Sequence, residues 1–175
     1  VGAGAIMSYL AKHAARFSLT GIEHLVGIPG SLGGAIIMNA GAEDTEIGSV
    51  LRSVTRITRN GEIETLKRED LSFQYRKTIF PDEVGIVTKA EIELKEGDRS
   101  KILANMDRHL SKRSQNQPLT TPNSGSIFKN PEGDAAGRTH TRDRGRRKTE
   151  GNGTGNPIQL LIELPHHHRR GEPLG

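Results

Sequence analysis

The sequence predicts an α+β fold from three observations. Segments 6–21 and 98–114 repeat apolar residues at the three- and four-residue spacing of an amphipathic helix. Segment 49–66 holds two short β-like runs around an Asn-Gly pair, and segment 85–95 alternates apolar and charged residues, as a half-buried strand does. Helix, hairpin, strand and helix in this order indicate one mixed α+β domain without internal repeats.

The composition narrows the classes of protein to consider. The 175 residues suit one ordinary domain or a piece of a larger protein, and 33% hydrophobic with 3% aromatic residues leave a lean core of Ile, Leu, Val and Ala. The net charge of +4 sits mostly in residues 139–175, because residues 1–138 hold 18 Lys and Arg against 17 Asp and Glu. A balanced body with few aromatics argues against a nucleic-acid partner. The absence of cysteine and of a long apolar run argues for a reducing cytoplasm and against a membrane partner.

The first predicted helix covers residues 6–21. Its apolar positions are Met7, Leu10, Ala11, Ala14 and Ala15, and Gly21 is a plausible stop signal. This helix leads into the glycine-rich stretch GIPGSLGGAIIMNAGA at residues 27–42.

The remaining predicted elements follow from turn and capping signals. Asn60-Gly61 suits the positive φ angles of a two-residue type I′ turn, which predicts a hairpin over 49–66. In segment 85–95, we expect Ile86, Thr88, Ala90, Ile92 and Leu94 to share the buried face. Asp98 is expected to cap a helix that continues to about Ser114, because Pro118 excludes a longer one. Its expected apolar stripe consists of Ile102, Leu103, Met106 and Leu110.

The glycine-rich stretch is compatible with a tight loop or with a cofactor loop. Gly30, Gly33 and Gly34 permit close approach and can offer backbone N–H groups to an anion or a flat ring. The spacing matches neither a P-loop, since no Lys follows, nor a dinucleotide-binding turn, since no hydrophobic strand leads directly into it. This stretch alone does not decide between the two readings.

Two further stretches carry chemistry-bearing side chains. In FQYRKTIF, residues 73–80, Arg76 stands among apolar neighbours, and a partly enclosed guanidinium favours a carboxylate or phosphate partner. In TPNSGSIFKNP, residues 121–131, a constrained turn carries Ser126 close to Lys129. A turn serine usually bonds its neighbouring backbone, but a nearby cation also makes it a candidate proton donor.

These three stretches, in this order and at these separations, closely resemble the UDP-N-acetylenolpyruvoylglucosamine reductase family over residues 1–138. The family consists of flavoenzymes that make UDP-N-acetylmuramate for peptidoglycan, and so serve cell wall biogenesis, cell shape and cell division. The resemblance implies FAD and NADPH as cofactors, a UDP-sugar substrate and a cytoplasmic location. It implies part of an FAD-binding lobe, residues 1–48, joined to a truncated substrate-binding α+β lobe, residues 49–138, incomplete at both ends.

The resemblance also implies roles for individual residues. Arg76 matches the family's catalytic arginine and Ser126 its serine proton donor. Substrate binding falls to Tyr75, Lys129 and Asn130, and no metal site is implied. Cofactor binding falls to Gly27, Ile28, Pro29, Gly30, Ser31, Gly33, Gly34, Asn39 and Gly41.

Two other interpretations remain beside the reductase. Residues 139–175 lack the family's helix, apolar strand and catalytic glutamate, so we expect an aberrant, disordered tail, with a shifted reading frame near Arg138 as the hypothesis. The chain is then an inactive truncated or frameshifted remnant with at most weak nucleotide-sugar binding, and we expect little or no reductase activity from it. The third interpretation is a nucleic-acid or metal-binding module built on the basic, His-bearing tail.

Overall fold

A three-stranded antiparallel sheet and two helices frame the part of the chain that the computed structural model describes, residues 1–43, 45–116 and 129–130. Residues Val1–Asn116 form one compact unit. Helices and short antiparallel strands alternate along it, so the predicted α+β class is confirmed. The elements are α1 (Met7–Arg16), β1 (Leu19–Thr20), η1 (Glu23–Leu25), α2 (Leu32–Ile37), β2 (Gly41–Ala42), β3 (Thr45–Glu46), η2 (Ile47–Ser49), β4 (Leu51–Ile57), β5 (Ile63–Lys67), η3 (Arg68–Asp70), β6 (Ser72–Gln74), β7 (Lys77–Ile79), β8 (Ile86–Ile92), β9 (Lys95–Glu96) and α3 (Arg99–Asn116).

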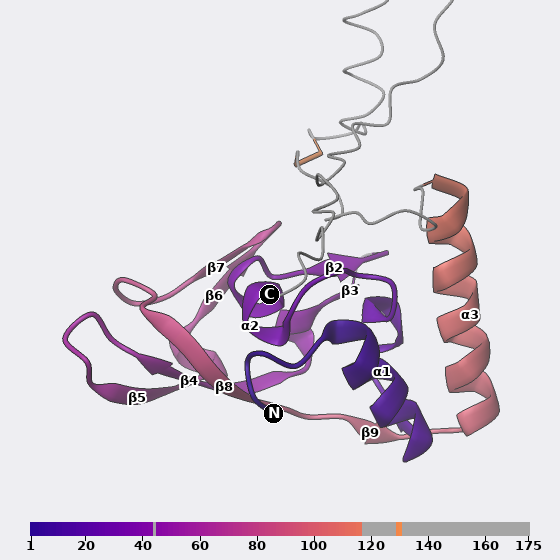
Figure 1. Ribbon diagram of the computed structural model, residues 1–175, viewed down its shortest axis with the longest axis horizontal. Helices are drawn as coiled ribbons and strands as arrows, with labels where there is room; N and C mark the ends of the chain where they lie inside the picture. The colour runs from indigo at the N-terminus through magenta and orange to yellow at the C-terminus, as the bar shows by residue number, and fades with distance from the viewer. Residues whose placement is uncertain (44, 117–128, 131–175) are drawn as a thin grey trace, which may run out of the picture. The chain divides into compact units, whose positions relative to one another are not determined.

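The main sheet has the strand order β5-β4-β8, and all pairs are antiparallel (Figure 1). The N-terminal residues extend it at the β8 edge, where the Ala90 N–H donates to Val1 O and the Ala3 N–H donates to Thr88 O, each at 2.9 Å. The chain then passes alongside the start of α2, whose Leu32 N–H donates to Ala5 O at 2.8 Å. The first residues therefore connect the sheet to the glycine-rich stretch.

The predicted hairpin over 49–66 is confirmed, but its turn is longer than expected. Thr58 pairs with Glu62, and the Gly61 N–H donates to Thr58 O at 3.0 Å, which leaves three residues in the loop. Gly61 has φ +84°, whereas Asn60 is not among the positive-φ residues. The three-residue loop matches a type I turn followed by a glycine with a left-handed backbone. In such a loop only the glycine needs a positive φ angle.

The alternation predicted for 85–95 is interrupted by a bulge. Val87 pairs with Arg56 and Lys89 with Thr55, so one extra residue of β8 lies between these pairs. Because a bulge reverses the side-chain alternation, Val87 and Ala90 are buried while Ile86, expected inside, is 66% exposed.

Both predicted helices form, with differences at one end and on one face. Helix α1 ends at Arg16 rather than Gly21, because Ser18 adopts a left-handed φ of +58°. Asp98 caps α3 as predicted, and its carboxylate accepts from the Ser100 N–H at 2.8 Å. Ile102 and Met106 are buried, but Leu103 is 43% exposed, so the apolar stripe is narrower than expected.

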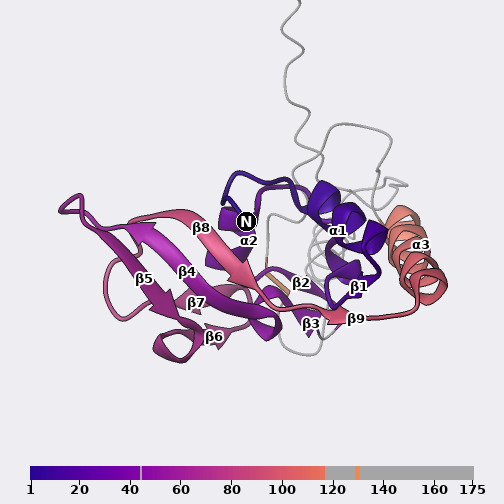
Figure 2. The same cartoon turned by 90° about the horizontal axis from the view of Figure 1, so that it is seen from below.

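Helices α1 and α3 lie side by side, at the end of the unit opposite the β4–β5 hairpin (Figure 2). The core between them and the sheet takes its largest fully buried apolar side chains from α1, η1, α2, η2 and β4. Those residues are Met7, Leu25, Leu32, Ile36, Ile47 and Val54, and Ile22, just before η1, is fully buried as well.

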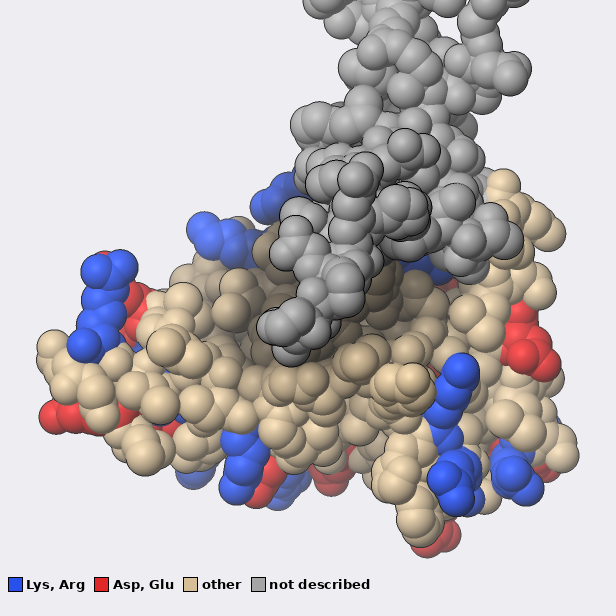
Figure 3. Space-filling view, in the orientation of Figure 1, with Lys and Arg blue, Asp and Glu red and all other residues tan. Residues whose placement is uncertain are grey.

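The charged surface of the described residues is mixed in sign. On the face shown in Figure 3, Lys and Arg side chains lie interspersed with Asp and Glu rather than gathered in one basic field. None of the helices in the described part of the chain is both long enough and apolar enough to cross a bilayer.

Candidate functional site

The glycine-rich stretch contains a short helix, α2, that neither the loop nor the cofactor reading predicted. Leu32 and Ile36 are completely buried on its inner face, and the Ser31 side chain caps its start by accepting from the Gly34 N–H at 3.5 Å. Gly33 and Gly34 are poor helix formers, so the burial of the flanking apolar residues decides the local structure.

Gly33 is required by the chain's own packing. Its N–H donates to Ala3 O at 2.8 Å, and a Cβ at this position would lie 3.0 Å from the Ala3 Cβ. The expectation that the Gly33 N–H is open to an anion or a ring is therefore wrong, because the N-terminal residues occupy that donor.

The outer side of the same stretch is open. Gly30 has φ +122°, and no atom of the described part of the chain lies within 4 Å of where its Cβ would be. Pro29, Gly34, Ile37 and Met38 are exposed along the same surface, the last two at 37% and 47%. Bare backbone beside exposed apolar side chains can receive a flat, largely apolar group.

Gly27 and Ile28 lie where the stretch meets α3. A Cβ on Gly27 would lie 2.9 Å from Arg113 Cδ, so this glycine allows the helix to approach. Ile28 is partly buried and packs against the core. Within Val1–Asn116, Gly27 and Ile28 are in contact with other residues of the protein.

Asn39 joins three segments at the end of α2. Its side chain is fully buried, and its amide donates to Glu46 and, at 3.1 Å, to Gln74 O. Its Oδ1 accepts from the Gly48 N–H at 3.2 Å. A buried amide with these bonds satisfied orders the polypeptide around it.

Gly41 begins the small β2–β3 hairpin, where no larger residue fits. A Cβ there would lie 2.1 Å from Thr45 O, well inside van der Waals contact. Its carbonyl accepts from Arg76 Nη2 at 2.8 Å. Gly41 therefore contributes both a close strand approach and an acceptor for the arginine.

Arg76 sits in the turn between β6 and β7 with φ +56°, an uncommon conformation for a non-glycine residue. Its guanidinium stacks over the Tyr75 ring at 4.8 Å, and its Nη1 lies 3.8 Å from Glu46 Oε1. The Arg76 side chain is 30% exposed, so the predicted partial enclosure is confirmed. One guanidinium face meets the protein, and donors remain for a ligand carboxylate.

The third predicted motif lies mostly outside the described residues. Ser126 lies outside the described residues. Lys129 and Asn130 are described, and both are exposed. They belong to a second unit, residues 117–175, separate from the one that holds the other predicted site residues.

Sequence reasoning missed Glu46, which contacts both Asn39 and Arg76. It lies 30 positions before Arg76, and its ion pair depends on two hairpins packing together. No spacing rule relates residues in separate hairpins, so the sequence offers no local signal for this pair.

A second charged cluster, where α3 packs against η1 and the β2–β3 turn, was also missed. Glu43 pairs with Arg108 at 2.6 Å and with Lys112 at 3.1 Å, and these cations lower the pKa of Glu43 to about 2. His24 is 6% exposed, and among the described residues its Nε2 has no hydrogen-bond partner. Burial, with nearby His109, lowers the pKa of His24 to about 4. This cluster attaches α3 to the rest of the unit.

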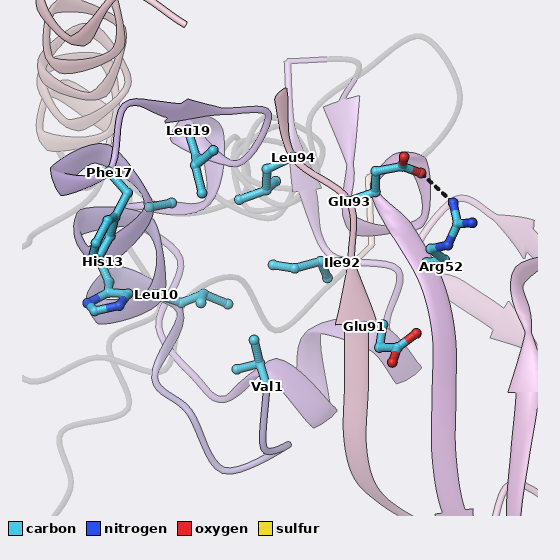
Figure 4. A pocket seen from close by; sticks show the side chains of 11 residues that line it. Val1, Leu10, His13, Phe17, Leu19, Arg52, Glu91, Ile92, Glu93 and Leu94 are labelled. Atoms are coloured by element: carbon cyan, nitrogen blue, oxygen red, sulfur yellow. Dashed lines mark hydrogen bonds and ion pairs between the residues drawn. The ribbon is translucent and has the colours of Figure 1, made fainter. Parts of the chain in front are cut away.

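A hollow of about 690 Å³ lies between α1 and the end of β8, and none of the predicted site residues within Val1–Asn116 lines it (Figure 4). Its walls are mainly apolar, and the Arg52–Glu93 ion pair, 2.9 Å, lies at one side. The apolar lining residues are Val1, Leu10, Ala14, Phe17, Leu19, Ile92 and Leu94. His13, Glu91 and Glu93 also line this hollow, so it has titratable side chains beside its apolar area.

Comparison with known proteins gives consistent similarities. Residues 1–67 match the FAD binding domain family. The chain is 44% identical over 137 residues to the UDP-N-acetylenolpyruvoylglucosamine reductase of Agathobacter rectalis, covering 78% of this chain and 44% of that protein. It is also 44% identical over 136 residues to the enzyme of that name from Streptococcus pneumoniae, covering 78% of this chain and 45% of that protein.

A solved structure gives the same similarity in three dimensions. The crystal structure of the UDP-N-acetylenolpyruvylglucosamine reductase from Thermus caldophilus superposes with a TM-score of 0.74 at 39% identity. The alignment covers 83% of this chain and 53% of that one. The chain thus spans about half the length of the relatives that it matches.

Proposed function

The chain corresponds in sequence and fold to part of a UDP-N-acetylenolpyruvoylglucosamine reductase, and we propose that it serves that family's reaction. The reaction is FAD-dependent, NADPH-driven reduction of UDP-N-acetylglucosamine enolpyruvate to UDP-N-acetylmuramate in peptidoglycan synthesis. Because the chain spans about half the length of its relatives, the activity of the whole protein is a proposal for this chain. The comparisons do not favour the alternative of an inactive remnant.

One observation carries the proposal: hydrogen bonds join the hairpin that bears Arg76 to the glycine-rich stretch. The Thr78 hydroxyl donates to Ile36 O at the end of α2. Asn39 donates to Gln74 O, and Arg76 donates to Gly41 O. Two motifs more than thirty residues apart are thereby assembled beside one open, glycine-bearing surface.

In this proposal the open outer side of residues 29–38 holds the isoalloxazine ring of FAD. When bound and reduced by NADPH, the flavin would supply the hydride for the enolpyruvyl double bond. Pro29, Gly30, Gly34 and the exposed Ile37 and Met38 give the ring a surface without clashes. Gly27, Ile28, Ser31, Gly33, Asn39 and Gly41 shape that surface, chiefly through contacts within the protein.

Arg76 is proposed to bind the carboxylate of the enolpyruvyl group. Negative charge develops toward this carboxylate during reduction, and a fixed guanidinium stabilises it where it forms. Tyr75 stacks under the guanidinium and borders the same position. Ser126 is proposed as the donor of the proton that completes the reduction, and Lys129 with Asn130 as contacts to the nucleotide part of the substrate.

The remaining features of the proposal concern the wider protein. The division into an FAD-binding part, 1–48, and a substrate-binding part, 49–138, belongs to the proposal, as does a cytoplasmic location. No nucleic-acid or membrane partner is proposed.

The test is an NADPH oxidation assay on the purified chain with FAD and the enolpyruvyl UDP-sugar. Unlike the inactive-remnant interpretation, which expects little or no activity, this proposal predicts turnover. Arg76→Met should abolish it and the matched control Arg52→Met should leave it unchanged, since Arg52 is an exposed arginine that pairs with Glu93. Binding of both ligands without turnover supports the inactive-remnant alternative. Absence of both binding and turnover overturns the proposal.

A further inference from the structure

Glu46 is placed to control the orientation of Arg76. Its Oε1 lies 3.8 Å from Arg76 Nη1, and its Oε2 accepts a hydrogen bond from the Asn39 amide. The two oxygens of the Glu46 carboxylate thus connect Arg76, whose side chain is of a flexible type, to Asn39, whose side chain is completely buried.

The Glu46 carboxylate is held in place by contacts with residues other than Arg76. Asn39 is fixed by the Gly48 N–H, 3.2 Å from its Oδ1, and by Gln74 O, 3.1 Å from its Nδ2. Glu46 also belongs to β3, whose backbone pairs with Gly41 in β2. Its position is therefore set by both backbone and side-chain contacts, as a positioning group requires.

The contacts around Arg76 leave it one defined orientation. Gly41 O takes one donor of the guanidinium, the Tyr75 ring covers one face, and Glu46 lies at Nη1. The left-handed backbone at Arg76 stores strain of the kind found at functional sites, and the surrounding contacts compensate for it. A guanidinium fixed in this way loses less freedom on binding a ligand than an unrestrained one.

We infer that Glu46 is a positioning residue for Arg76: it orients the guanidinium so that its remaining donors meet a ligand carboxylate. The inference rests on the proposed function only for the identity of that ligand. Glu46 carries no chemistry of its own and acts through the arginine.

The opposite effect is physically possible, which makes the inference testable. A carboxylate close to an anion site also weakens binding by repulsion. If repulsion outweighs orientation, neutralising Glu46 tightens the binding of an anionic ligand. If orientation outweighs repulsion, the same substitution weakens it.

The first measurement is NMR of the ¹⁵N-labelled full chain, with the guanidinium signals of Arg76 assigned by their loss in Arg76→Met. In wild type we expect restricted rotation about the Nε–Cζ bond, seen as separate Nη signals. Glu46→Gln keeps an acceptor for Asn39 but removes the charge, and we expect the Nη signals to merge while the fold is retained. Glu64→Gln is the matched control, because Glu64 bonds Arg56 and is similarly exposed, 40% against 32%.

The second measurement is the affinity for the enolpyruvyl UDP-sugar in a double-mutant cycle. Glu46→Gln should weaken binding roughly two- to fivefold, as expected for losing an ion pair of 3.8 Å that is about one-third exposed. In the Arg76→Met background the same change should have no effect, which a purely structural role of Glu46 does not predict. Tighter or unchanged binding in Glu46→Gln, or the same loss in both backgrounds, overturns the inference.

The two measurements separate this inference from the proposed function. Separate Nη signals that persist in Glu46→Gln refute the positioning role whatever the ligand. Merged signals in a chain that does not bind the sugar nucleotide support the positioning role and refute the proposed ligand.

Discussion

Protonation of His24 should destabilise the fold by an amount that the structure allows us to work out. His24 is almost completely buried beside His109, and its pKa is lowered from 6.5 to about 4. The folded state therefore favours the neutral ring, so the stabilisation is complete above pH 6.5 and is lost as the pH falls toward 4. With these two pKa values, the loss between pH 7 and pH 5 is about 2 kcal/mol, and the limiting loss at lower pH is about 3 kcal/mol.

The assay is urea unfolding at several pH values between 7 and 5, followed by circular dichroism. Carboxylates also titrate at the acidic end, so the quantity to compare is the difference between wild type and His24→Gln. We expect the variant to lose about 2 kcal/mol less than wild type over this range. His13→Gln, at an exposed histidine of α1, should follow wild type. Parallel curves for wild type and His24→Gln would refute the reasoning.

Two further substitutions test the packing that positions the site. Arg56→Ala should lower the free energy of unfolding by about 3 kcal/mol, because Arg56 is fully buried and bonded to two carboxylates. The control Arg52→Ala, at an exposed ion pair, should cost less than about 1 kcal/mol. Equal costs of the two substitutions in urea unfolding would contradict this account. Gly41→Ala should cost about 2 kcal/mol, because a Cβ there overlaps Thr45 O, while Gly4→Ala, with nothing within 4 Å, should be neutral within about 0.5 kcal/mol. A thermally stable Gly41→Ala variant would show that the β2–β3 hairpin can shift to accept a side chain.

Local signals predicted those features that depend on neighbouring residues. The cap at Asp98, the hairpin around Gly61 and the buried positions Ile102 and Met106 of α3 follow from contacts within a few residues, whereas Leu103 is exposed against expectation. The exposed Ile86 was missed because a bulge in β8 arises from pairing with β4, which no single segment reveals. Helix α2 was missed because burial outweighed the low helix propensity of Gly33 and Gly34.

The candidate site was predictable only in part for the same reason. The partial enclosure of Arg76 could be predicted, because its apolar neighbours in the chain indicated it. Its partner Glu46 could not, because the ion pair forms between two separate hairpins. Gly33 illustrates the converse, since the sequence showed that bare backbone was needed but not that Ala3, rather than a ligand, lies against it.

The central claim is that residues 27–42 and Arg76 form one site for a flavin and a carboxylate-bearing sugar nucleotide. The most direct measurement is the visible absorption spectrum of the purified chain with added FAD, followed by titration with the enolpyruvyl UDP-sugar. The account predicts bound flavin whose spectrum shifts with the sugar nucleotide, and a shift that needs higher sugar-nucleotide concentrations in Arg76→Met. A protein that stays colourless, or a bound flavin that ignores the sugar nucleotide, would contradict it.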